Sequence, residues 1–74
     1  MGTSVYKIVI GMAMYAKLEI RPTSYSVQKE AIDAIKKACK EKGITIKHET
    51  TEGDRVFFQN EHGGVIATVV ASSI

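Results

Sequence analysis

The chain has 74 residues, which is enough for one hydrophobic core and excludes a multidomain protein, so residues 1–74 are expected to form a single domain. Hydrophobic residues make up 45% of the sequence and charged residues 24%, as in globular rather than disordered proteins. The formal net charge of +2 is too small to indicate an acidic partner by itself.

Cysteine content and hydropathy predict the cellular location of the protein. Cys39 is the only cysteine, so a disulfide within the chain is excluded and a reducing, cytoplasmic location is favoured. The chain does not open with a basic stretch followed by an apolar run, and no apolar stretch reaches the roughly 18 residues that span a bilayer. We therefore expect neither a signal peptide nor contact with a membrane.

The first part of the chain has the period of a β-strand. Apolar residues occupy every second position, at Tyr6, Ile8, Ile10, Met12, Met14, Ala16, Leu18 and Ile20. Residues 5–21 are about three times as long as a typical strand, so the segment either bends at Gly11 or folds back as a hairpin through Gly11, Met12 and Ala13. Because Met and Ala are poor turn residues, the favoured prediction is one long strand that is kinked at Gly11.

A helix is predicted next. Pro22 is expected to end the strand, and Thr23, Ser24 and Ser26 offer side-chain oxygens that can cap a helix. The apolar residues then follow helical spacing along one stripe, which consists of Val27, Ala31, Ile32, Ala34, Ile35, Ala38 and Cys39. Gly43 is expected to end the helix in the left-handed conformation.

The period of two returns after Gly43 and predicts three further strands. They run from Ile44 to Glu49, from Arg55 to Gln59 and from Val65 to Ala71, with turns at residues 52–54 and 60–64. The last strand is apolar on nearly both sides, which predicts a central position or cover on both faces. The expected fold class is α+β with the order β-α-β-β-β, in which one helix packs on one face of a mostly antiparallel four-stranded sheet with a long, kinked first strand.

One helix can cover only one face of such a sheet. The apolar residues predicted for the other face are Val5, Val9, Ala13, Tyr15 and Phe57. An exposed apolar patch of more than a few hundred Å² is unusual on a monomer. We therefore predict that this face, or the edge of the long strand, is a protein interface, either in a homodimer or with another protein.

The sequence does not assemble a set of residues for catalysis or for binding a metal or cofactor. His48 and His62 stand apart without metal-ligand spacing, and Cys39 lies on the apolar stripe of the helix, where thiols usually act as small hydrophobes. The run His62-Gly63-Gly64 precedes a strand rather than a helix, so a hairpin loop is expected instead of a phosphate loop. An enzyme would need a site formed between subunits around His48 or His62, and no enzymatic activity is predicted.

A mild basic bias is the basis of an alternative function. The residues that could contact nucleic acid are Lys29, Lys36, Lys37, Lys40, Lys47 and Arg55. Asp33 stands four residues from both Lys29 and Lys37, and Glu41 four residues from Lys37, as on an ordinary salt-bridged helix surface. Aromatic residues that could stack on bases do not interleave with them.

The order of elements from Lys37 through Val70, a helix, a glycine and three strands with an aromatic pair, resembles the α-β-β-β core of small double-stranded-RNA-binding-like domains. The architecture of one helix and a long-stranded sheet also resembles cystatin-like folds. Because only the order or the architecture is shared, we assign no family. The sequence favours a small non-enzymatic protein-interaction module, accessory or inhibitory, that self-associates, and the alternative is a nucleic-acid-binding module.

Overall fold

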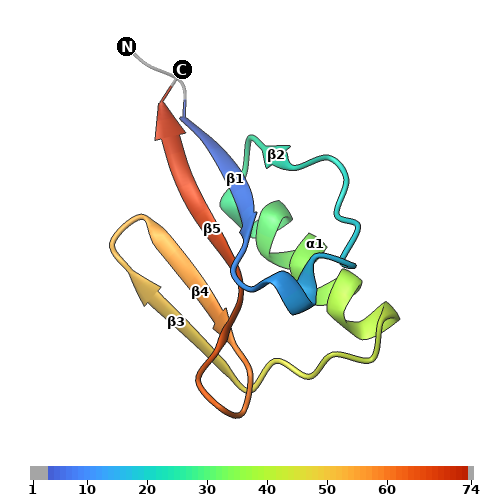
Figure 1. Ribbon diagram of the computed structural model, residues 1–74. Helices are drawn as coiled ribbons and strands as arrows, with labels where there is room; N and C mark the ends of the chain where they lie inside the picture. Colours follow the sequence, from blue (N-terminus) through green and yellow to red (C-terminus); the bar gives the residue numbers. More distant parts are fainter. Residues whose placement is uncertain (1–3, 74) are drawn as a thin grey trace.

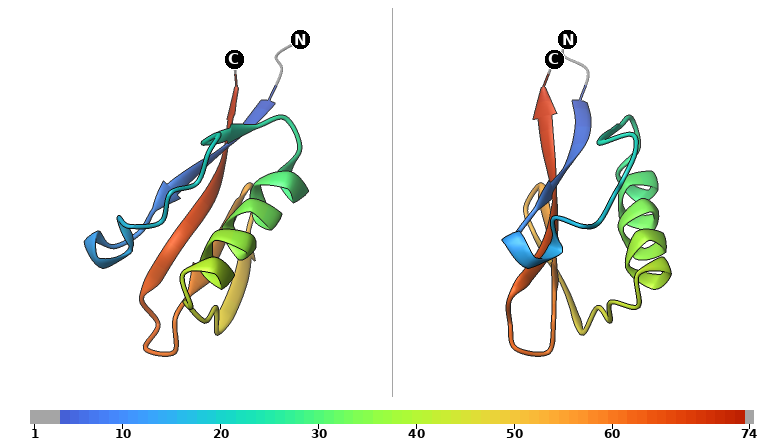
Figure 2. Two further views of the ribbon diagram at one scale, coloured as in Figure 1. Left: turned by 90° about the vertical axis from the view of Figure 1, so that its right-hand side faces the viewer. Right: turned by 45° about the vertical axis from the view of Figure 1, so that its right-hand side comes forward.

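The computed structural model describes residues 4–73 (Figure 1). Its elements are β1 (Ser4–Ile10), a short 3-10 helix η1 (Ala13–Tyr15), β2 (Ser24–Tyr25), α1 (Gln28–Glu41), β3 (His48–Glu52), β4 (Arg55–Gln59) and β5 (Val65–Ser73). The strands form one antiparallel five-stranded sheet in the order β2-β1-β5-β4-β3. Figure 2 shows α1 as a separate layer against one face of this sheet. The predicted α+β class with a single packed helix is confirmed, with one strand more than expected.

The core lies between α1 and the face of the sheet that it covers, which we call the inner face. Ala31, Ile35 and Cys39 of the helix are buried in one cluster with Val56 and Phe58 of β4. Fully burying a side chain such as Phe58 contributes about 1.5–3 kcal/mol to folding. The predicted helical stripe from Ala31 to Cys39 is therefore the surface that holds the two layers together. Val27, predicted as its first residue, precedes the helix and is 50% exposed, so that part of the prediction is wrong.

Strand β5 lies in the centre of the sheet, which is one of the two arrangements that its apolar sequence predicts. It pairs with β1 on one side and with β4 on the other. A β-bulge interrupts the second pairing, because Phe58 pairs with Ala67 and Gln59 pairs with Val65, so Ile66 has no partner on β4. The bulge turns the side chains of both Ile66 and Ala67 into the core, where both are fully buried.

The first strand is shorter than predicted, because β1 ends at Ile10. A Cβ atom on Gly11 would lie 2.4 Å from the carbonyl oxygen of Val65, so only glycine fits at this close approach to β5. The chain then turns through η1 and returns to β1 as β2, where Tyr25 pairs with Tyr6. The prediction of one long strand is therefore wrong. The alternative prediction of a hairpin through residues 11–13 is wrong as well, because the chain pairs with β1 again only at Ser24 and Tyr25.

The two ends of α1 differ in how well the sequence predicts them. The helix begins after Val27 without a side-chain cap, so the expected caps at Thr23, Ser24 and Ser26 are wrong. At the other end Gly43 has φ = 71°. The backbone N–H of Ile44 donates to the Cys39 carbonyl at 2.8 Å and that of Gly43 donates to the Lys40 carbonyl at 3.3 Å. This pair of bonds is a Schellman motif, which confirms the predicted end of the helix.

Strand β3 starts four residues later than predicted, at His48 instead of Ile44. Residues 44–47 instead cross from the end of α1 to the sheet, and Ile44 and Ile46 pack partly buried against the core. Only Gly53 and Asp54 separate β3 from β4. Gly53 has a positive φ and Asp54 does not, which is the pattern of a type II′ hairpin turn.

We expect Gly43→Ala to lower the free energy of unfolding by about 1 kcal/mol, because alanine is strained in the left-handed conformation. No atom lies within 4 Å of the Cβ position at Gly43, so the cost is conformational rather than steric. Urea unfolding measures it. Gly43→Asn is the control and should lose less, since asparagine tolerates this conformation better. Equal stability of the alanine variant and the natural protein would contradict the left-handed conformation of residue 43 at the end of α1.

Candidate functional site

The face of the sheet that points away from α1, the outer face, carries two cross-strand rows. The strand registers place Val9, Thr68, Phe57 and Thr50 side by side across β1, β5, β4 and β3. Val9 is 52% exposed, and Phe57 is partly exposed. This row is mainly apolar at β1 and β4 and ends in a threonine at the edge of the sheet.

The second row of the outer face carries charge. Lys7 pairs with Val70, Val70 with Arg55, and Arg55 with Glu52. The row therefore runs from a lysine on β1 to a glutamate on β3. The outer face therefore carries an apolar row beside a charged row.

Three of the five residues predicted for the uncovered face lie there. Val5 and Val9 share one side of β1, and Phe57 shares that side through its pairing with Thr68. The prediction that Tyr15 lies on this face is wrong. Tyr15 is only 6% exposed and belongs to the core, because η1 turns its side chain inward. Ala13 lies in η1 rather than on a strand, so it is not part of the sheet face either.

The six basic residues predicted for nucleic acid do not form one surface. Lys29, Lys36, Lys37 and Lys40 are exposed on α1. The ammonium group of Lys36 lies 3.1 Å from a carboxylate oxygen of Glu49. Side chains alternate between the two faces along β4, and Val56 and Phe58 are the buried residues of this strand. Arg55 has the opposite parity and therefore lies on the outer face, away from the helix. Lys47 lines a separate pocket.

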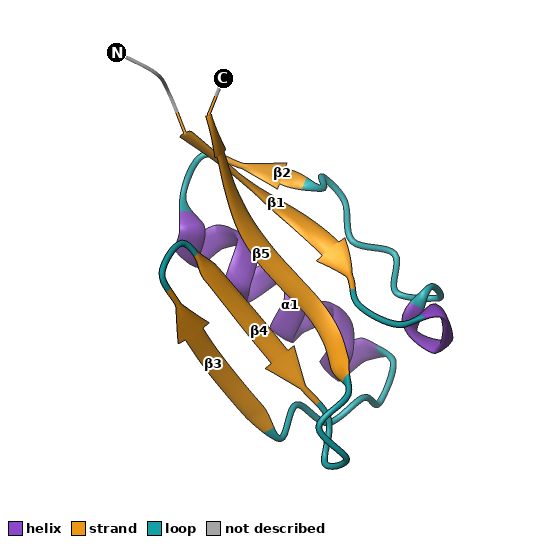
Figure 3. Cartoon of the chain, turned by 60° about the vertical axis from the view of Figure 1, so that its left-hand side comes forward, coloured by secondary structure: helices purple, strands orange, loops and turns teal. Residues whose placement is uncertain are grey.

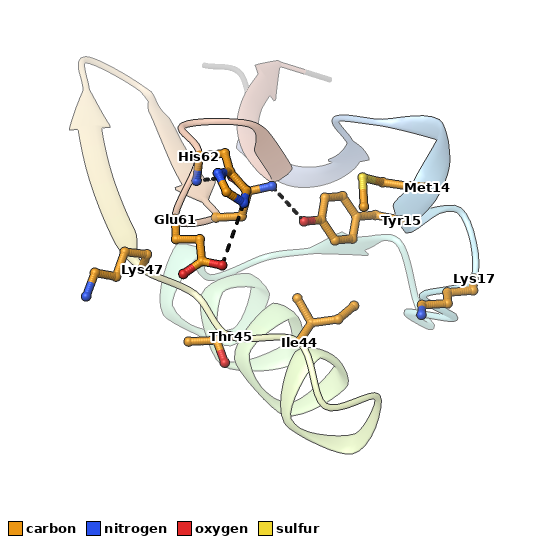
Figure 4. A pocket seen from close by; sticks show the side chains of 9 residues that line it. Met14, Tyr15, Lys17, Ile44, Thr45, Lys47, Glu61 and His62 are labelled. Carbon is orange, nitrogen blue, oxygen red and sulfur yellow. Dashed lines mark hydrogen bonds and ion pairs between the residues drawn. The ribbon is translucent and has the colours of Figure 1, made fainter.

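This pocket has a volume of about 510 Å³ and lies among the loops at one end of the molecule (Figure 4). Its walls come from the chain around η1, from the segment after α1 and from the loop between β4 and β5. The lining residues are Met14, Tyr15, Lys17, Ile44, Thr45, Lys47, Asn60, Glu61 and His62. The volume falls within the range of small-molecule sites.

Asn60 organises one wall of the pocket. Its side-chain oxygen accepts the backbone N–H groups of His62 and Gly64, both at 2.9 Å. Its side-chain nitrogen donates to the hydroxyl oxygen of Tyr15 at 2.8 Å. Asn60 therefore ties the loop before β5 to η1, and an asparagine at the start of a glycine-containing turn is the sequence signal that would have indicated this role.

The other chemistry-bearing residues do not come together. Within residues 4–73, no group of three or more His, Cys, Asp and Glu side chains is arranged to hold a metal ion. His62 and Glu61 lie 3.7 Å apart and are both highly exposed, so they are a solvated pair. Cys39 is 1% exposed, and burial raises the pKa of its thiol, which makes the reactive thiolate scarce.

No helix in the described part of the chain is long and apolar enough to cross a membrane. Comparison with known proteins finds no matching family model, no matching curated protein and no matching solved structure.

We expect Asn60→Ala to lower the free energy of unfolding by about 2 kcal/mol, because the variant loses three hydrogen bonds and leaves partly buried groups unpaired. Urea unfolding measures the loss. The control is Gln59→Ala, which removes one exposed hydrogen bond to Gly63 and should cost much less. Similar losses in the two variants would contradict the role given to Asn60.

Proposed function

We propose that this protein is a non-enzymatic protein-interaction module that self-associates by antiparallel pairing of β3 with β3 of a second copy. The observation that carries the proposal is the open edge formed by β3. This strand is the last of the sheet order (Figure 3), and all five of its residues are exposed. An edge strand of this kind is a template for pairing with another chain.

The turn at Gly53 and Asp54 determines which backbone groups of β3 are free. A two-residue turn makes its flanking residues, Glu52 and Arg55, a hydrogen-bonded pair. Because such pairs alternate along an antiparallel ladder, Glu49 and Thr51 direct their N–H and C=O groups away from β4. These groups are available to a second strand.

The sequence of β3 is self-complementary under a two-fold axis through its central residue. Thr50 is then opposite Thr50 of the second copy, and Glu49 is opposite Thr51, so the free backbone groups meet in hydrogen-bonded pairs. His48 is opposite Glu52 at both ends of the contact. Threonine pairs and opposite charges across strands each contribute roughly 0.2–1 kcal/mol, and the His48–Glu52 pairs are of opposite charge when the histidine is protonated. A shift by one residue would lose this matching.

Pairing through β3 also extends the outer face. The row of Val9, Thr68, Phe57 and Thr50 would continue into the same row of the second copy in reverse order. The charged row would pass from Glu52 to His48 of the second copy. The resulting surface is long enough to receive another protein, and it supports an accessory or inhibitory role. Contact through one short strand buries less area than a standard stable interface, so the self-association is expected to be weak and dependent on concentration.

We expect Thr51→Pro to abolish self-association without unfolding the protein. Proline removes the outward N–H of Thr51 and leaves the bonds between β3 and β4 intact. Light scattering on a sizing column at high and low protein concentration measures the mass. Thr51→Ala is the control and should associate like the natural protein. A monomer at all concentrations for the natural protein would overturn the proposal.

Cysteine cross-linking tests the register. Thr50 faces itself in a non-hydrogen-bonded pair, whose Cα atoms lie about 4.5 Å apart and suit a disulfide. Thr50→Cys should therefore form disulfide-linked dimers under mild oxidation, as seen on a non-reducing gel. Thr51→Cys should not, because it faces Glu49 and lies too far from its own copy. The natural protein controls for Cys39, which is buried. Equal cross-linking at both positions would contradict the register.

A further inference from the structure

Tyr15 brings a polar group to the wall of the loop pocket from a nearly buried side chain. Only 6% of the residue is exposed, yet it lines the pocket. Figure 4 shows its ring beside the loop of His62, with the hydroxyl group joined to that loop. Because the ring is buried, the Tyr15 hydroxyl group is held at a fixed place in the pocket wall. What it can bind there depends on whether it donates or accepts in its contact with Asn60.

The hydrogen bonds of Asn60 show which role the Tyr15 hydroxyl group has in this contact. Because the Asn60 oxygen accepts two backbone N–H groups, its nitrogen must be the atom that faces Tyr15. The Tyr15 hydroxyl oxygen is therefore an acceptor in this contact, and its own hydrogen is free. Among the described residues, no hydrogen bond is donated by this hydroxyl group. The pocket thus holds one positioned donor that has no acceptor within residues 4–73.

The charge and the apolar surface of the pocket define what such an acceptor would be. Lys17 and Lys47 lie on opposite sides of the pocket, and Ile44 lies between them (Figure 4). Two lysines against Glu61 leave one surplus positive charge among the lining residues when His62 is neutral. Met14 is 62% exposed and adds a second apolar side chain to the lining.

We propose that this pocket binds a small organic monoanion, in which a carboxylate accepts the Tyr15 hydroxyl hydrogen and an apolar body lies against Ile44 and Met14. The single surplus positive charge favours a monoanion over a polyphosphate. None of the residues of β3 lines the pocket, so the site is independent of the self-association proposed above. The two proposals can therefore fail separately.

The test is a ligand titration of the full chain in which each addition is monitored by a proton–nitrogen correlation spectrum. The probes are phenylacetate and its uncharged analogue phenylacetamide. We expect saturable shifts for the amides of Thr45, Asn60 and His62 with phenylacetate, and much weaker binding of phenylacetamide. Tyr15→Phe should weaken phenylacetate binding by about tenfold, the effect of one lost hydrogen bond to a charged group. Its spectrum and melting temperature show whether the fold is kept.

A charge variant keeps the proposal testable should Tyr15→Phe disturb the fold. Lys17→Gln with Lys47→Gln should weaken phenylacetate binding and reduce its dependence on salt. The matched control is Lys29→Gln with Lys37→Gln, which removes the same charge from exposed residues of α1 and should leave binding unchanged. The proposal is overturned by the absence of saturable shifts, by equal binding of the two probes, or by shifts that centre on Val9 and Phe57.

Discussion

Packing of α1 against the inner face of the sheet is the constraint on which the other features depend. A chain of this length supplies only one long helix, and its apolar stripe meets β4 and β5 through Phe58 and Val69 in one continuous cluster. This contact covers one face and leaves the outer face without a second layer. It also places β3 at the edge beyond the buried strands, where its polar side chains remain in solvent. The outer face and the β3 edge are therefore the parts of the sheet that the single helix leaves exposed.

A close approach at Gly11 shapes the other end of the molecule. The Gly11 backbone packs on that of Val65 and donates to the Ile66 carbonyl at 3.0 Å, beside the bulge in β5. The chain then leaves the sheet and turns through η1, which brings Tyr15 to Asn60. One contact between two backbones therefore ends β1, buries an aromatic ring and builds a wall of the pocket. The sheet edge and the pocket consequently have separate structural origins.

The agreement between sequence and structure follows from the range of the interactions involved. The helical stripe from Ala31 to Cys39 and the end of the helix at Gly43 are local signals, and both agree with the structure because periodicity and a left-handed glycine act within one or two turns. The period of two in residues 12–20 was misleading. Leu18 and Ile20 are buried as expected, but they are buried from an irregular segment, and Met14 of the same parity is exposed. Alternation by itself does not distinguish a strand from a loop that contacts the core at intervals.

The sequence by itself determined the α+β class, the helix with its C-terminal end, and the apolar character of the last strand, because each depends on spacing or composition along a short stretch. Only the tertiary structure decided where the first strand ends, that Tyr15 turns inward, that Arg55 lies away from the helix lysines, and that β3 forms an open edge. These features depend on contacts between residues far apart in the chain, such as Gly11 with Val65 and Tyr15 with Asn60. Such contacts leave no periodic signal, because they are selected by the packing of the whole core.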